Sequence, residues 1–387
     1  MNSQQIPEEF KDIRPYAPDE LPAVFDRLLS DEQFMQAVET VMPGTSREQL
    51  AAQLSKCPTN TDVQRCFFYP LVKQVLAACS KGIDLKMHEG FESDKPHTFI
   101  TNHRDIVLDS AFLSYLLVKN GFPTTVEIAI GDNLLVRPWI KELVRVNKSF
   151  IVQRSLSMRE MLRASQVMSR YMHFAIDQKK ENIWIAQREG RAKDSDDRTQ
   201  DALLKMMVMG GEGSVIERLR NLHLTPMALS YEYDPCDFLK AKEFQQRRDD
   251  ADFKKSGDDD LRSMKTGIFG QKGRIHFEAA PCIDGWLDTL DPAMPKTDLF
   301  PLIAQHIDRE IHRCYRLYPG NYVAADELRG TADHAACYTA DERAAFLDYI
   351  QQRIAMVDLE HPDASFLRER LLTMYANPVF NHETACQ

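Results

Sequence analysis

The alternation of short β-rich runs with helical patterns constrains the fold of this chain most strongly. The β-rich runs are residues 97–101, 126–130, 149–152, 182–186, 224–230 and 274–278. Segments with apolar residues at three- and four-residue spacing separate them, and this alternation favours an α/β fold. We therefore expect an α/β domain over residues 82–296, with a central mixed sheet flanked by helices.

Both ends of the chain differ from this middle part. Residues 1–81 show helical spacing broken by proline and glycine, and residues 297–387 return to helical patterns. We expect a helical N-terminal region and a helical C-terminal region, with the clearest C-terminal helices at 298–318, 339–357 and 363–375. The highly charged stretch 235–265 is typical of a solvated insertion or a mobile loop.

Composition excludes several classes of protein. The chain has 387 residues, with 43% hydrophobic and 27% charged residues and a net charge of −10, so disorder and coating of nucleic acid are disfavoured. None of the eight cysteines forms a CxxC pair, which favours buried thiols in a reducing cytosol. The first residues lack a secretory-signal pattern, and the apolar stretch 106–118 is too short to span a bilayer.

The first chemical feature is a histidine and a carboxylate that follow a strand. The run 97–101 leads directly into Asn102-His103-Arg104-Asp105, and the next helix carries Asp109. The carboxyl ends of strands are where α/β folds bind ligands, and a carboxylate behind a histidine orients it as a general base. Asp105 is a second candidate partner. No GxSxG motif is present, so the base would activate a substrate hydroxyl.

Two further clusters are candidates for binding anions. Residues 137–170 contain eight basic and two acidic side chains. Among them, the spacing of Arg137, Lys141, Arg145 and Lys148 is compatible with one helix face, which either is ordinary solvated surface or binds anionic lipid or an acidic carrier protein. The run 183–191 ends in Gly190-Arg191, where glycine permits close backbone approach and the arginine is suited to phosphate.

Metal and phosphate-loop motifs are missing. His306, Glu310 and His312 do not form HExxH, and the glycine-rich stretches 210–213 and 267–273 lack the GxxxxGK[ST] pattern. We therefore expect no metal site.

Taken in order, four segments resemble the blocks of the glycerophospholipid acyltransferase family. The segments are Asn102 to Asp109, Lys148-Ser149-Phe150-Ile151-Val152-Gln153-Arg154, Gln187-Arg188-Glu189-Gly190-Arg191, and Leu224-Thr225-Pro226-Met227-Ala228. The resemblance covers roughly residues 95–285, and it is specific as a set. His103 and Asp109 are one residue farther apart than in the family. Lys148 replaces a glycine, Arg188 replaces a proline and Arg191 comes one place early.

This resemblance implies roles for individual residues. His103 would be the general base and Asp109 would orient it. The residues expected to contact a phosphate-bearing glycerol acceptor are Arg104, Arg154, Glu189, Gly190, Arg191 and Pro226. The hydroxyl would attack an acyl thioester directly, with backbone amides stabilising the oxyanion. The resemblance implies no metal or redox cofactor, and acyl-CoA or acyl-carrier protein would be the co-substrate.

Several alternatives remain open at this stage. The acceptor is glycerol 3-phosphate, a lysophospholipid or another lipid hydroxyl such as that of an aminoacyl-lipid precursor. A catalytically silent protein that binds lipid or acyl-carrier protein is the alternative from another class. We expect a cytoplasmic protein, peripheral on the inner face of the cytoplasmic membrane.

Overall fold

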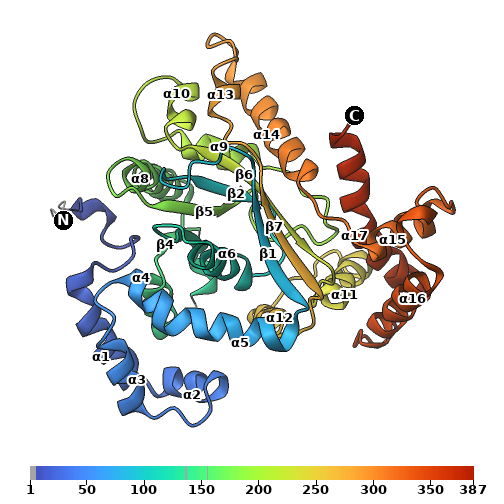
Figure 1. Ribbon diagram of the computed structural model, residues 1–387, viewed down its shortest axis with the longest axis horizontal. Helices are drawn as coiled ribbons and strands as arrows, with labels where there is room; N and C mark the ends of the chain where they lie inside the picture. Colours follow the sequence, from blue (N-terminus) through green and yellow to red (C-terminus); the bar gives the residue numbers. More distant parts are fainter. Residues whose placement is uncertain (1–5, 136, 155) are drawn as a thin grey trace.

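A seven-stranded sheet forms the centre of the computed structural model, which describes residues 6–135, 137–154 and 156–387 (Figure 1). Its strands are β1 (Gly82–Met87), β2 (Thr98–Thr101), β3 (Val126–Gly131), β4 (Ser149–Val152), β5 (Asn182–Ala186), β6 (Leu224–Tyr231) and β7 (Arg274–Ala279). The six strands β2–β7 agree with the prediction to within one residue at each end. The expected α/β fold with a mixed sheet is confirmed.

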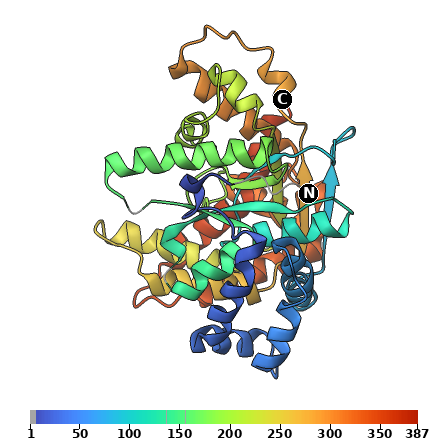
Figure 2. The same ribbon diagram turned by 90° about the vertical axis from the view of Figure 1, so that its left-hand side faces the viewer.

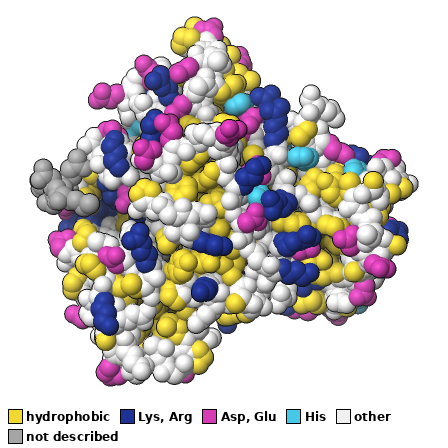
Figure 3. All heavy atoms as spheres, in the orientation of Figure 1, with side chains coloured by type: hydrophobic (Ala, Val, Ile, Leu, Met, Phe, Trp, Pro, Cys, Tyr) yellow, Lys and Arg dark blue, Asp and Glu magenta, His cyan; other side chains and the backbone are white. Residues whose placement is uncertain are grey.

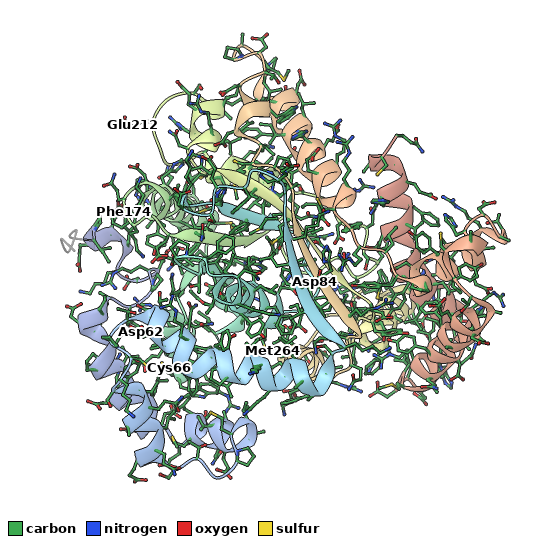
Figure 4. The ribbon with its side chains drawn as sticks, in the orientation of Figure 1. Asp62, Cys66, Asp84, Phe174, Glu212 and Met264 are labelled. Atoms are coloured by element: carbon green, nitrogen blue, oxygen red, sulfur yellow. The ribbon has the colours of Figure 1, made fainter. Side chains whose placement is uncertain are left out.

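The strand order β1-β7-β6-β2-β5-β3-β4 places parallel and antiparallel neighbours in one sheet. Strands β6, β2, β5, β3 and β4 are parallel to one another, whereas β7 is antiparallel to β6. The edge strand β1, which the sequence analysis missed, alternates exposed and half-buried residues. Asp84 of β1 (Figure 4) accepts a hydrogen bond from His276 of β7 at 2.9 Å, so a polar contact joins this edge to the sheet.

Helices cover both faces of the sheet. One face packs against α8 (Met158–Asp177), α9 (Asp201–Met207), α10 (Val215–Arg220), α13 (Asp284–Leu287) and α14 (Lys296–Arg313). The other face packs against α5 (Tyr69–Cys79), α6 (Leu108–Lys119) and α12 (Gly257–Phe269). Side chains alternate along a strand, so Ile183 and Ile185 join the first core and Trp184 joins the second. Figure 2 shows α8 on one side of the sheet and the N-terminal helices on the other.

The N-terminal helices form a separate small core beside the sheet. They are α1 (Leu21–Ser30), α2 (Glu32–Val41), α3 (Arg47–Leu54) and α4 (Asn60–Val63), and they pack against α7 (Pro138–Val146). The contact with α7 includes a tilted ring pair between Phe34 and Trp139, whose centroids lie 5.9 Å apart. The expected helical N-terminal region is therefore present, and it rests on the central domain through α7.

The C-terminal helices gather around α11 (Asp237–Asp249). They are α15 (Pro319–Arg329), α16 (Ala340–Ala355) and α17 (Ala364–Ala385). The prediction of a solvated or mobile loop at 235–265 was wrong, because this stretch forms α11 and α12. Phe238 and Ala241 of α11 are buried among the C-terminal helices, so apolar residues between the charges hold the segment in place.

The boundary expected at residue 297 does not separate two cores. Ile303 and Ile307 of α14 belong to the same buried cluster as Ile100 of β2. Residues beyond 297 thus complete the packing of one sheet face, and the three-part division of the chain stays a prediction. Within the described residues, no helix is both long enough and apolar enough to cross a bilayer.

A buried carboxylate joins α11 to the C-terminal helices, and it yields a stability prediction. Asp237 is fully buried, forms an ion pair with Arg353, and accepts hydrogen bonds from Tyr349 at 2.6 Å and Tyr375 at 2.8 Å. Replacing Arg353 by Met leaves this charge without its cation, so we expect the free energy of unfolding to fall by about 3–5 kcal/mol. Urea denaturation followed by circular dichroism measures this change.

Arg343→Met provides the control for this experiment, since Arg343 pairs with Glu327 at the surface and is half exposed. An exposed pair contributes only about 0–1 kcal/mol. Equal losses in the two variants would contradict a special role for the buried pair.

Candidate active site

The candidate site lies where the carboxyl ends of the parallel strands meet. Strands β2, β5, β3 and β4 run in the same direction, so the residues that follow them gather at one edge of the sheet. His103 follows β2, Arg154 follows β4 and Glu189 follows β5. The structure therefore brings together three of the segments that the sequence analysis singled out.

A hydrogen bond joins the two residues expected to act as base and orienting carboxylate. Nδ1 of His103 donates to Oδ2 of Asp109 at 2.8 Å, despite the extra residue between them. The His103 side chain is 13% exposed, and its ring packs edge-on against Trp184. Within the described residues, Nε2 of His103 has no hydrogen-bond partner, so no protein donor occupies the lone pair of this nitrogen.

Asp105, the alternative carboxylate partner of His103, binds backbone N–H groups instead. Its Oδ1 accepts the backbone N–H groups of Val107 at 2.9 Å and Leu108 at 2.8 Å. These groups lie at the start of α6, so Asp105 holds the turn that leads into the helix carrying Asp109. Burial and the Asp109 charge raise the pKa of Asp105. Helix α12 approaches so closely at Gly267 that any Cβ there would collide with the Asp105 carboxylate.

The Asp109 carboxylate is fully buried and surrounded by donors. Oδ2 also accepts the backbone N–H of Arg104 at 2.7 Å and that of Asp105 at 3.0 Å, and Oδ1 accepts the hydroxyl of Tyr231 at 2.8 Å. A buried carboxylate needs such partners to remain charged. Burial, with the charge of Asp109, raises the pKa of Tyr231 well above its usual value, so this tyrosine stays a donor.

Tyr231 and Trp184 are site residues that sequence reasoning missed. Each lies on a strand adjacent to β2, Tyr231 at the end of β6 and Trp184 in β5. Their contact with the dyad depends on the strand order, which the sequence did not specify. The position of Tyr231 at the end of a strand was the only available signal.

Three predicted binding residues lie in the loops beside this dyad. Nη1 of Arg154 donates to Oε1 of Glu189 at 3.1 Å, which joins the segments after β4 and β5. Gly190 has a φ of +66°, a left-handed conformation that glycine adopts without strain. These observations concern contacts and backbone conformation within the protein. The expected binding of substrate by Arg154, Glu189 and Gly190 therefore stays a prediction.

Arg191 lines a cleft in which basic side chains outnumber the acidic ones, Glu243 and Asp259. The cleft is formed by the loop after β5 together with α11 and α12, and its basic side chains are Arg191, Lys193, Lys240, Lys242, Lys255 and Arg262. Burial disfavours the Arg191 charge, but neighbouring groups that include Asp234 and Asp105 raise its pKa overall. Nη1 of Arg191 is buried without a hydrogen-bond partner among the described residues. The cleft can therefore accept an anion next to the loop that carries His103.

Arg104 forms an ion pair with a neighbouring loop, and its expected contact with the acceptor stays a prediction. Its guanidinium forms a bidentate ion pair with Asp197, with N···O distances of 3.0 and 2.6 Å, and Tyr315 donates to the same carboxylate at 2.5 Å. The Arg104 side chain is 7% exposed. Through Asp197, these contacts join the His103 loop to the loop after β5 and to the segment after α14.

Pro226 lies within the sheet, away from its ligand-binding edge. It is opposite Ile100 of β2, and its carbonyl accepts the N–H of Ala280 at 2.9 Å. All residues of β6 are buried. The expected contact between Pro226 and an acceptor stays a prediction.

The basic stripe expected at residues 137–148 is not one exposed face. Arg145 is buried, where it donates to the carbonyls of Arg14 at 2.8 Å and Lys11 at 2.6 Å. Lys148 is also buried and pairs with Glu181 at 2.8 Å. The proposal of a single docking face was wrong because tertiary contacts use two of its four cations. On the face in Figure 3, Lys and Arg side chains are spread among apolar and acidic ones.

Comparisons with known proteins found a matching family model and a similar solved structure. A family model described as Acyltransferase matches residues 82–230. A solved structure, the 1-acyl-sn-glycerophosphate (LPA) acyltransferase PlsC from Thermotoga maritima, aligns with 11% sequence identity and a TM-score of 0.35 over 76% of this chain and 96% of that chain. No curated protein matches this sequence. The acyltransferase family model thus matches residues 82–230 of this chain, and this match supports the resemblance drawn from the four motifs.

Proposed function

We propose that the chain is an O-acyltransferase of glycerolipid synthesis, which transfers a fatty acyl group from an acyl thioester to a hydroxyl of a glycerol-phosphate or lysophospholipid acceptor. The observation that carries this proposal is the His103–Asp109 hydrogen bond at the carboxyl edge of the sheet, where Nε2 of His103 has no partner among the described residues. The family match over residues 82–230 supports acyl transfer as the reaction class.

The geometry is consistent with direct transfer. Nε2 of His103 takes the proton of the acceptor hydroxyl, and the Asp109 charge stabilises the resulting imidazolium. The acceptor oxygen then bonds to the thioester carbonyl carbon, and the C–S bond breaks as the tetrahedral intermediate collapses. The imidazolium returns its proton to the departing thiolate. This sequence of steps is balanced without a metal or redox cofactor, and acyl-CoA or acyl-carrier protein supplies the thioester.

The dyad gives a direct test of the mechanism. We expect His103→Ala to lower kcat by about 10²- to 10⁴-fold, because it removes the general base. Asp109→Asn should also lower kcat, since an amide cannot stabilise the imidazolium and its NH₂ group would face backbone N–H donors. Acceptor-dependent thiol release from a long-chain acyl-CoA or acyl-carrier protein measures both effects.

A matched control separates this role from a general loss of structure. His88 is half-buried in the loop after β1, where its ring nitrogen contacts the carbonyl of Glu89 at 2.6 Å. His88→Ala should retain wild-type activity. Full activity in His103→Ala would refute the mechanism. Binding of the acyl donor without transfer by the wild-type protein would instead favour the silent lipid- or carrier-binding alternative.

We assign the phosphate of the acceptor to the cationic cleft at Arg191. A buried guanidinium nitrogen that has no partner among the described residues is suited to a phosphate oxygen, and basic side chains outnumber acidic ones in the lining of the cleft. We expect Arg191→Met to raise KM for a phosphate-bearing acceptor by about 10- to 100-fold, the range expected when a hydrogen bond to a charged group is lost. Initial rates at varied glycerol 3-phosphate and lysophosphatidate concentrations measure this change.

Arg198→Met is the control for this prediction, because Arg198 lies in the same loop but is exposed and pairs with Asp196 at 3.0 Å. For an acceptor with a neutral lipid hydroxyl, KM should be the same in Arg191→Met and in the wild type. If a neutral acceptor were used better than the phosphate-bearing ones, the alternative of another lipid hydroxyl would replace the first proposal.

We further propose that the protein associates peripherally with an anionic membrane surface through the first turns of α8. Leu162 is 52% exposed and Met161 is 42% exposed, and Arg159 and Arg163 flank them in exposed positions. Apolar side chains between cations are suited to the interface between lipid headgroups and acyl chains. We therefore propose that the protein lies at the inner face of the cytoplasmic membrane.

Vesicle binding tests this proposal. We expect Leu162→Glu to weaken sedimentation with anionic phospholipid vesicles by about 10-fold or more, because an apolar side chain contributes about 2 kcal/mol on burial. Met356→Glu is the control, since Met356 is similarly exposed at 47% at the end of α16. Equal vesicle binding by the wild type and Leu162→Glu would refute this surface.

A further inference from the structure

A second group of reactive side chains lies at the amino-terminal end of β6, away from the dyad. Imidazole, thiol and carboxylate ligand atoms from His223, Cys282 and Asp284 all lie within 4.8 Å of one another. The eight residues of β6 separate this cluster from Tyr231, which contacts Asp109. At about 3.3 Å per residue, the eight steps from His223 to Tyr231 span about 26 Å, so the cluster takes no part in acyl transfer.

The backbone holds the three side chains in place. The N–H of Ile283 donates to the carbonyl of Leu224 at 2.9 Å, and Ile283 is buried in the main core. His223 has a φ of +48°, which is costly for a residue with a side chain and therefore requires support from its surroundings. The sheet and the turn that enters α13 thus hold the segment with His223 against the segment with Cys282 and Asp284.

The contacts of Asp284 leave one of its oxygens unused. Oδ2 accepts a hydrogen bond from Nδ1 of His223 at 2.6 Å, whereas Oδ1 is buried without a partner among the described residues. Buried carboxylate oxygens normally have a donor, a water or a cation as a partner. A neutral hydrogen-bonding network would leave this oxygen unsatisfied, and a bound cation would satisfy it.

The donor set selects the class of cation. Nitrogen, sulfur and oxygen ligands together suit Zn²⁺, which binds imidazole and carboxylate at about 2.0 Å and thiolate at about 2.3 Å. Tetrahedral geometry at these bond lengths places two ligand atoms about 3.3–3.5 Å apart. The atoms of the cluster are already within 4.8 Å, so small side-chain rotations complete the arrangement.

We infer that His223, Cys282 and Asp284 form a structural site for one Zn²⁺ ion, with water in the fourth position. Binding replaces the thiol proton of Cys282, which is released to solvent, so no other reactant is required. The ion connects the start of β6 to the turn after β7. Because β6 carries Tyr231 at its other end, the site stabilises the strand that supports the dyad without contacting substrate.

Cobalt serves as a spectroscopic probe for the site in the full-length wild-type protein. Adding Co²⁺ to the reduced protein should produce a thiolate-to-cobalt charge-transfer band in the near ultraviolet at one equivalent, and Zn²⁺ should displace it. Cys282→Ser and His223→Ala should lose the band. Absence of the band in the wild type would overturn the inference, whatever the variants do.

A second cysteine provides the matched control. Sγ of Cys386 lies 3.7 Å from Nε2 of His382, so this pair is the competing thiol–imidazole site. Cys386→Ser should keep the band, and loss of the band in Cys386→Ser with retention in Cys282→Ser would overturn the assignment. Zinc should raise the Tm of the wild type and of Cys386→Ser but not that of Cys282→Ser. Equal shifts in all three proteins would also refute the site.

Discussion

The rest of the candidate site depends on the buried carboxylate of Asp109. Its charge is removed from water, so the fold must supply donors for both oxygens, and it does so from three directions. Backbone N–H groups of the β2–α6 turn, the ring of His103 and the hydroxyl of Tyr231 converge on it. The same hydrogen bonds that make the charge tolerable also fix the orientation of the His103 ring. Stability and the proposed chemistry therefore share one set of contacts.

The C-terminal helices contribute to this edge of the sheet through the loop that follows β5. Asp197 of this loop holds Arg104 and Tyr315, and Thr199 donates to Asp308 of α14 at 2.6 Å. Asn377 of α17 donates to the carbonyl of Asp194 at 2.9 Å. These contacts hold the loop that carries Arg191 against the sheet. The helical extension thus acts as a scaffold for the cationic cleft, beyond the residues that match the acyltransferase family.

Local patterns predicted the sheet well where strands are buried. Strand β5 begins at the polar Asn182 and continues as an uninterrupted apolar run to Ala186, and its bounds agree with the prediction. Prediction failed where partners are distant in sequence. Strand β1 is half exposed, so its pattern is mixed, and α11 is rich in charges that pair with distant residues such as Arg353. For the same reason, Arg145 was expected at the surface but is buried by the N-terminal segment.

The sequence by itself indicated strands β2–β7, the pairing of His103 with Asp109, and the resemblance to the acyltransferase family, whose model matches residues 82–230. These follow from local periodicity and from motifs whose members lie within a few residues of one another. Only the tertiary structure decided that Tyr231 supports Asp109, that Arg104 pairs with Asp197, and that Cys282 lies beside His223. The strand order sets these contacts, and it depends on packing between segments far apart in the chain.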